Sequence, residues 1–97
     1  ENKIGAAEVR AVFPIAKGFV AGCLVVEGRV VVKQHARLIR NGKTVAEHKI
    51  DALRRVKDDV KEVRAGTECG IHISNTNDYQ VGDIIEVYEI HEIRPEL

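Results

Sequence analysis

The sequence predicts an all-β domain, built as a sandwich or a barrel. Valine and isoleucine, which favour strands, dominate the apolar residues, whereas aromatic residues make up only 4% of the chain. Turn signals recur roughly every eight to twelve residues, a spacing typical of several short strands that share one core. Because 97 residues can close one core but not two, we expect a single domain over residues 1–97.

Two strands are expected at the start of the chain. Residues 7–13 alternate in polarity for most of their length, which predicts a strand with one buried face. Pro14 lacks a backbone N–H and is expected to end that strand. Residues 19–26 predict the second strand, and Gly22 within it marks a place where another backbone or a ligand comes close.

The middle of the chain carries the clearest turn signal. Asn41-Gly42 separates the apolar-patterned runs at residues 36–40 and 43–50, and this dipeptide in that setting is the strongest short hairpin signal. Before the hairpin, Glu27-Gly28 is expected to turn the chain into a strand over residues 29–33.

The later part of the chain predicts two more strands, at residues 69–74 and 84–93, separated by the turn-rich residues 75–78. Between the hairpin and these strands, five apolar residues recur at helical spacing: Ile50, Leu53, Val56, Val60 and Val63. We predict no helix there, because valine and isoleucine fill helices poorly and no capping residue follows the hairpin strand.

Composition and charge narrow the function classes. Fifteen basic and fifteen acidic residues give a formal net charge of zero, which argues against bulk, sequence-blind binding of nucleic acid. Two cysteines are too few for a disulfide framework and are typical of a reducing compartment. No stretch predicts a membrane span or a leader, and a chain that begins at Glu1 is expected to be a segment of a longer protein. Basic residues concentrate mid-chain, at Arg29, Lys33, Arg37, Arg40, Lys43 and Lys49.

Two fragments of the sequence resemble parts of functional motifs, a phosphate-binding loop and a zinc site, but neither motif is complete. Gly42-Lys43-Thr44 imitates the end of a phosphate-binding loop, but Arg37 stands where that loop needs a glycine, so any GTP site is expected outside this chain. Cys69 and His72 have the spacing of half a zinc site, yet the sequence offers no second close pair of ligands. We therefore predict no metal and no cofactor. A disulfide between Cys23 and Cys69 is conceivable, but reduced, buried thiols fit this sequence better.

A basic cluster precedes a glycine-rich turn in the second half of the chain. Arg54, Arg55 and Lys57 are followed by two aspartates, which alone would predict a solvated loop. The turn Glu68-Cys69-Gly70 comes next, and such an arrangement can hold phosphates while exposed backbone N–H groups receive a carbonyl.

Three motifs in order give the chain a resemblance to a known family: Ala21-Gly22-Cys23, then residues 52–57 (Ala-Leu-Arg-Arg-Val-Lys), then Glu68-Cys69-Gly70. Over nearly its whole length the chain resembles the C-terminal, initiator-tRNA-binding (C2) domain of bacterial-type translation initiation factor two. Residues 6–14 are most similar to cyanobacterial or plastid members.

The resemblance implies a fold and a function. The fold would be a closed six-stranded antiparallel β-barrel like domain II of translational GTPases, with one strand ending near Arg55 before a compact loop. The function would be binding of the formylmethionyl 3′ end of initiator tRNA, with recognition of the formylated amino group and protection of the ester. No catalysis is implied for this domain, because GTP hydrolysis would belong to another domain of the full-length factor.

The resemblance also implies a cellular setting. The domain would be a monomer that reaches the ribosome through the full-length factor, without a membrane partner. It would work in the bacterial cytoplasm or, alternatively, in a plastid or the mitochondrial matrix.

The resemblance implies eight binding residues: Cys23, Arg54, Arg55, Val56, Lys57, Glu68, Cys69 and Gly70. The thiols and Val56 would form apolar walls for methionine, the three cations would hold terminal phosphates, and a neighbouring cation or backbone donors would engage Glu68. The chain departs from the family pattern at Ala52, Val56 and His72, which affects the shape of the pocket.

Two other functions remain as alternatives. One is a structural barrel that docks onto a GTPase domain or the ribosome through its basic middle. The other is a thiol enzyme that uses Cys69 with His72.

Overall fold

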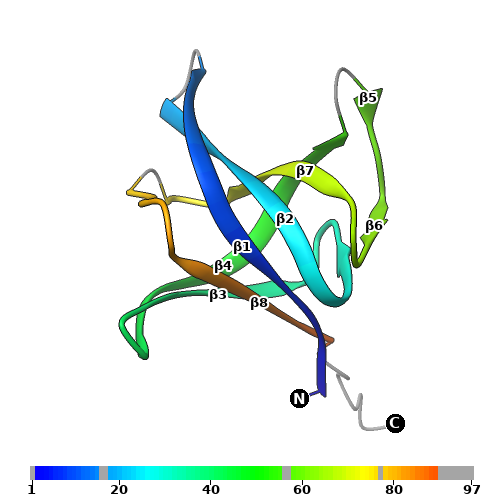
Figure 1. Cartoon of the computed structure of the whole chain (residues 1–97), viewed down its shortest axis with the longest axis horizontal. Coiled ribbons are helices and arrows are strands. Elements are labelled where there is room, and N and C mark those ends of the chain that lie inside the picture. Colours follow the sequence, from blue (N-terminus) through cyan, green and yellow to red (C-terminus); the bar gives the residue numbers. More distant parts are fainter. Residues whose placement is uncertain (1, 16–17, 56–57, 77, 90–97) are drawn as a thin grey trace, which may run out of the picture.

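The computed structural model describes residues 2–15, 18–55, 58–76 and 78–89 (Figure 1). Their strands are β1 (Asn2–Ile15), β2 (Gly18–Val31), β3 (His35–Arg40), β4 (Lys43–Arg55), β5 (Asp58–Asp59), β6 (Glu62–Arg64), β7 (Glu68–Ile73) and β8 (Ile84–Glu89). No helix of the described chain is long and apolar enough to cross a membrane. The described residues between the hairpin and β7 are not helical, as predicted.

Six of these strands close into an antiparallel barrel, which confirms the predicted fold. The hydrogen-bonded order is β1-β8-β3-β4-β7-β2, and β2 pairs again with β1 to complete the ring. The short strands β5 and β6 lie outside the ring, paired with β4 and β2 respectively. Figure 1 shows β1 and β2 running together as a long hairpin across one side of the barrel.

The barrel interior is filled by small and branched apolar side chains, as the valine and isoleucine content predicts. The buried Tyr79 hydroxyl forms hydrogen bonds beside this core. It donates to the Thr76 carbonyl at 2.8 Å and accepts from the Ile73 backbone N–H at 2.9 Å. The largest fully buried side chains are Leu38, Ile50, Leu53, Ile71, Ile73, Ile85, Val9, Val25, Val30 and Val87.

The prediction that Pro14 ends the first strand is wrong. The strand β1 continues to Ile15, and Pro14 pairs with Phe19 of β2. A residue without an N–H is tolerated here because β8 pairs with β1 only as far as Glu8. Beyond Glu8, among the described residues, only Val9 forms backbone hydrogen bonds on that edge, with Gly82 and Asp83. Phe13 also lies above the barrel and is 53% exposed, so the buried face of the strand is shorter than predicted.

The predicted turn at Glu27-Gly28 is also wrong, because β2 runs through both residues. Gly28 has a φ of +57° and pairs with Gly5 of β1. A Cβ on Gly28 would lie 2.1 Å from the Ile4 carbonyl oxygen. The absence of a side chain therefore allows the backbones of β1 and β2 to lie close together here. The chain bends at this point without reversing.

The predicted hairpin between β3 and β4 is confirmed. Asn41 and Gly42 both have positive φ values, +53° and +78°, as a two-residue turn of this sequence requires. The strand β4 ends at Arg55, where the resemblance implied an end. The last strand is described up to Glu89, and the rest of the predicted span 84–93 lies outside the described residues.

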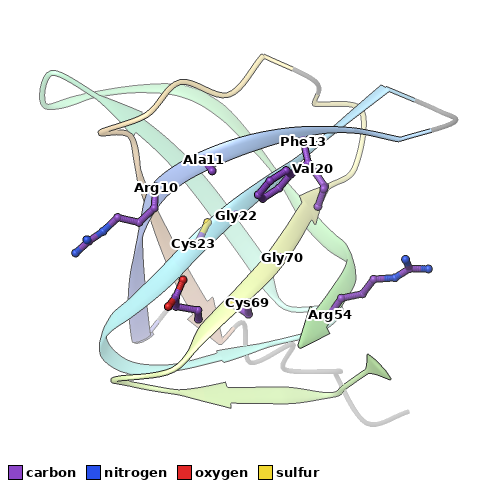
Figure 2. A pocket seen from close by; sticks show the side chains of 10 residues that line it. Arg10, Ala11, Phe13, Val20, Gly22, Cys23, Arg54, Cys69 and Gly70 are labelled. Carbon is purple, nitrogen blue, oxygen red and sulfur yellow. The ribbon is translucent and has the colours of Figure 1, made fainter. Parts of the chain in front are cut away.

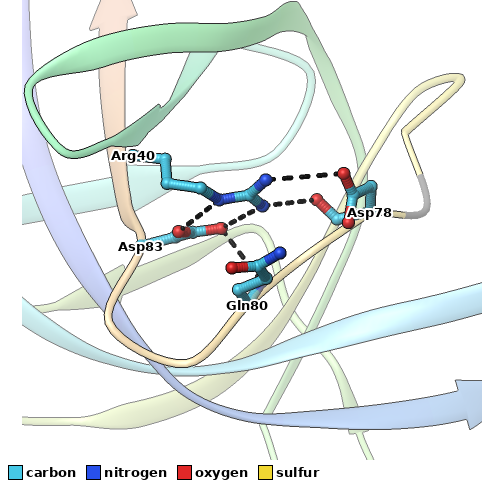
Figure 3. A network of polar contacts seen from close by, with 4 residues as sticks. All are labelled: Arg40, Asp78, Gln80 and Asp83. Carbon is cyan, nitrogen blue, oxygen red and sulfur yellow. Dashed lines mark hydrogen bonds and ion pairs between the residues drawn. The ribbon is translucent and has the colours of Figure 1, made fainter.

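A partly buried ion pair ties the loop before β8 to β3 (Figure 3). Arg40 Nε and Nη2 donate to the two carboxylate oxygens of Asp83 at 3.0 and 2.8 Å, and Asp83 is only 2% exposed. The Gln80 backbone N–H donates to the same carboxylate at 2.9 Å. Burial alone would raise the pKa of Asp83, but the bonds from Arg40 and Gln80 outweigh it and hold the pKa below its usual value of 3.8.

The Arg40 contact predicts a pH-dependent contribution to stability. A carboxyl whose pKa is depressed in the folded state stabilises the fold above its unfolded pKa and loses that contribution as the pH falls through the folded value. We expect Asp83→Asn to lower the free energy of unfolding by about 2 kcal/mol at pH 7, and this deficit should shrink as the pH falls below about 4. Denaturant unfolding from pH 7 to pH 2 measures both quantities.

Asp78→Asn is the control for this experiment, because Asp78 is exposed and its carboxylate lies 3.5 Å from Arg40. It should change the stability little at any pH. A deficit for Asp83→Asn that stays constant down to pH 2 would contradict the assignment.

Candidate ligand pocket

A pocket of about 520 Å³ lies on the outer face of the barrel, over β1, β2, β7 and β4 (Figure 2). It is lined by Arg10, Ala11, Phe13, Val20, Gly22, Cys23, Arg54, Glu68, Cys69 and Gly70. Five of the eight predicted binding residues are therefore at one place: Cys23, Arg54, Glu68, Cys69 and Gly70.

The floor of the pocket follows from the pairing of the strands. Ala11 pairs with Gly22, Gly22 pairs with Gly70, and Gly70 pairs with Arg54, so one row of residues crosses four strands. Gly22 and Gly70 alternate with the buried Cys23 and Cys69, which places them on the outer face. Since three members of this row have little or no side chain, a hollow forms above the backbone.

An apolar wall borders this floor, formed by residues near the end of β1 and the beginning of β2. Phe13 pairs with Val20, and both line the pocket. The Phe13 ring lies over Gly22 so closely that a Cβ there would be 2.6 Å from its Cε2 atom. Gly22 therefore marks a close approach, but the approaching group is the Phe13 side chain and not the backbone or ligand that was predicted.

The two cysteines border the pocket but offer it little surface. Cys23 and Cys69 pair directly across β2 and β7, and they are only 2% and 5% exposed. Both thiols are free, and Cys23 Sγ lies 3.5 Å from the Ala21 carbonyl oxygen. Burial raises the pKa of both thiols, that of Cys69 to about 11, so neither is an activated nucleophile. Phe13 and Val20 therefore supply more of the apolar wall than the thiols do.

The basic cluster is only partly described. Arg54 and Arg55 are exposed at the end of β4, opposite Asp59 and Asp58 of β5. Arg54 Nε forms an ion pair with Asp59 Oδ1 at 2.9 Å, so one of its donors is already occupied. Arg55 does not line the pocket. The predicted site residues Val56 and Lys57 lie outside the described residues.

The carboxylate of Glu68 is exposed at the pocket. Within the described ranges it forms no ion pair or side-chain hydrogen bond, so the expected engagement of Glu68 by Arg54 or Arg55 is not seen. Engagement by Lys57 lies outside the described residues.

His72 is not placed to act as a base for the Cys69 thiol. The two residues are three apart on β7, so Cys69 faces the core while His72 faces outward and its Nδ1 bonds to Asp51 Oδ1. The thiol-enzyme alternative is therefore wrong. Among the described residues, no group of histidine, cysteine and carboxylate side chains could hold a metal ion.

Sequence reasoning missed half of the lining residues as members of the site: Arg10, Ala11, Phe13, Val20 and Gly22. Gly22 had a signal, as an isolated glycine in a strand pattern. The positions of the other four residues in the pocket depend on how β1 pairs with β2, and no short sequence motif predicts that pairing.

Comparison with known proteins places the chain in a family. No protein-family model matches the sequence. Translation initiation factor IF-2 of Syntrophobacter fumaroxidans is 52% identical over 98 aligned residues, which include 100% of this chain and 10% of that protein. IF-2 of Aquifex aeolicus is 51% identical over 100% of the chain and 12% of its own length. The chain is homologous to a segment of IF-2. It spans about a tenth of the length of these IF-2 relatives.

The comparisons do not single out one bacterial lineage. IF-2 of Synechocystis, a match that covers 93% of the chain and 9% of that protein, is 49% identical. The IF-2 proteins of Syntrophobacter and Aquifex match at a similar level. The expected likeness to cyanobacterial or plastid IF-2 therefore stays a prediction.

Proposed function

We propose that this barrel binds the formylmethionyl 3′ end of initiator tRNA as the C-terminal domain of an IF-2 protein. One observation carries the proposal: residues from β2, β4 and β7 that the resemblance implies as ligand contacts meet in a single pocket. In this proposal GTP hydrolysis belongs to another domain, and the full-length factor brings the barrel to the ribosome in the bacterial cytoplasm.

The chemistry of the pocket suits an aminoacyl ester of a nucleotide. Phe13 and Val20 form an apolar wall that can contact the methionine side chain. The glycine floor lets the ester and the formamide lie close to the backbone. Arg54 keeps terminal guanidinium donors for a phosphate, because Asp59 occupies only its Nε.

Formylation changes the charge that the pocket must accept. An amino-terminal ammonium would lose part of its hydration against the apolar wall, whereas a formamide is neutral. The exposed Glu68 carboxylate opposes this discrimination only weakly, since water screens its attraction for an ammonium. We expect a preference of about tenfold or more for the formylated ligand, which corresponds to about 1.4 kcal/mol or more.

Binding of three ligands tests this function: formylmethionyl-tRNA, methionyl-tRNA and uncharged tRNA. The formylated form should bind best, and saturating protein should lengthen the half-life of its ester, because the bound ester is shielded from water. Equal affinities together with an unchanged ester half-life would overturn the proposal.

One observation favours the docking-module alternative. Arg54 and Arg55 face Asp59 and Asp58 across β4 and β5, so each of these two cations already stands opposite a carboxylate. A module that only docks onto a protein would bind the three tRNA forms equally, so the same experiment separates the two functions.

A further inference from the structure

We propose that Arg10 is a second phosphate anchor, which holds the backbone of the RNA 3′ end on the β1 side of the pocket, opposite Arg54. The inference rests on the proposed function and adds a contact to it. It starts from a β-bulge in β1.

The bulge turns Arg10 toward the pocket face. Val9 pairs with Cys23 and Val12 pairs with Ala21, and Val9, Cys23 and Ala21 are all buried. Three steps along β1 therefore match two steps along β2, which leaves both Arg10 and Ala11 on the outer face. A regular strand would place only one residue there. Bulges of this kind are frequent beside binding sites, where they redirect a side chain.

A carboxylate fixes Arg10 while leaving most of its donors available. Arg10 Nε pairs with Glu8 Oε1 at 2.7 Å, and the side chain remains 56% exposed. A guanidinium has five N–H donors, so the terminal Nη groups can still form the bidentate contact that a phosphate accepts. Arg54 has the same arrangement, with Nε on Asp59 at 2.9 Å and 63% exposure.

The two arginines flank the pocket on opposite sides. Figure 2 shows both side chains extending outward from the glycine floor in opposite directions. The row that joins Ala11 to Arg54 crosses three inter-strand spacings, or roughly 14 Å. An amino acid alone is too short to reach both sides, since one extended residue covers about 3.5 Å. A terminal nucleotide with its phosphates carries the negative charge needed beyond the aminoacyl group.

The acidic neighbours restrict where the phosphate can lie. Glu68 lines the same pocket and would repel a phosphate placed over the floor. Glu8 neutralises part of the charge on Arg10 but occupies the Nε side. The phosphate is therefore expected at the outer, Nη end of Arg10.

Arg10→Gln tests the anchor, with Arg64→Gln as a matched control. Arg64 also pairs through Nε with a glutamate two residues earlier, Glu62 at 3.1 Å, and does not line the pocket. The probe is a short RNA hairpin that ends in CCA and carries formylmethionine. We expect Arg10→Gln to bind it about fivefold to tenfold more weakly at low salt, with the slope of log K against log salt reduced by about 0.7.

Three further measurements make the test decisive. Arg10→Lys should restore the salt slope, because it keeps the charge. Formylmethionyl-adenosine, which has no phosphate, should bind wild type and Arg10→Gln equally. Arg54→Gln should weaken binding of the hairpin as Arg10→Gln does.

The outcomes separate this inference from the proposed function. Normal binding and an unchanged slope in Arg10→Gln, with Arg54→Gln impaired, would overturn the role of Arg10 and leave the pocket in place. An equal loss in Arg10→Gln and Arg64→Gln would also overturn it, because the effect would then be general electrostatics. A wild-type protein that binds neither probe would overturn the proposed function itself.

Discussion

Gly5→Ala is expected to destabilise the barrel by more than about 3 kcal/mol, enough to unfold much of a marginally stable domain. A Cβ at Gly5 would lie 2.0 Å from the Arg29 carbonyl oxygen and 2.5 Å from the Arg29 nitrogen. Both atoms belong to the backbone, so no side chain can rotate to make room. The strands β1 and β2 would have to separate where Gly5 pairs with Gly28, close to the buried Val30.

Gly70→Ala is the control for Gly5→Ala, because Gly70 is also a strand glycine. Its added Cβ would lie 3.6 Å from Val20 Cγ2, an ordinary van der Waals contact. Denaturant titration of both variants should show a large loss for Gly5→Ala and a small change for Gly70→Ala. If the two variants are equally stable, β1 and β2 do not approach as closely as the structure shows.

Local signals in the sequence were enough for much of the fold. Asn41-Gly42 predicted its hairpin because the turn needs two residues with positive φ, and that demand is met inside the dipeptide. The predictions at Pro14 and Gly28 are wrong for the opposite reason. Whether a proline ends a strand depends on which edge is paired, and whether a glycine turns or bends the chain depends on the strand beside it. The answer for Pro14 lies in how far β8 pairs along β1, and the answer for Gly28 lies in its pairing with Gly5, so both depend on residues distant in the sequence.

Short motifs in the sequence likewise indicate some features of the candidate pocket and not others. The motifs around Cys23 and Glu68-Cys69-Gly70 lie on β2 and β7, which both border the candidate pocket, and the structure joins them by direct pairing of Cys23 with Cys69. The sequence predicts free, buried thiols, as the structure shows, but the motifs did not indicate how little of the pocket surface these thiols supply. Arg10 reaches the pocket through a bulge, and a bulge changes the pairing without a short sequence signature in this chain.

Gly70→Leu is expected to abolish binding of formylmethionyl-tRNA, by about a hundredfold or more, while the barrel stays folded. Gly70 lies in the floor of the pocket on the outer face, between Gly22 and Arg54 in the cross-strand row. A leucine side chain there would fill the hollow that the proposed ligand enters, and the lost apolar and backbone contacts amount to about 2.7 kcal/mol or more.

A graded series connects the loss of binding to the lost space. Gly70→Ala should bind more weakly than wild type and Gly70→Leu much more weakly, while the two unfold at similar denaturant concentrations, since the added atoms of leucine meet solvent and not the core. Ala52→Leu is the matched control, because Ala52 pairs with His72 on the outer face of the same two strands but, contrary to the expectation that it shapes the pocket, does not line it. It should bind normally. A folded Gly70→Leu that binds as well as Ala52→Leu would show that the ligand does not occupy this hollow, and it would move the binding site of this IF-2 segment elsewhere on the barrel.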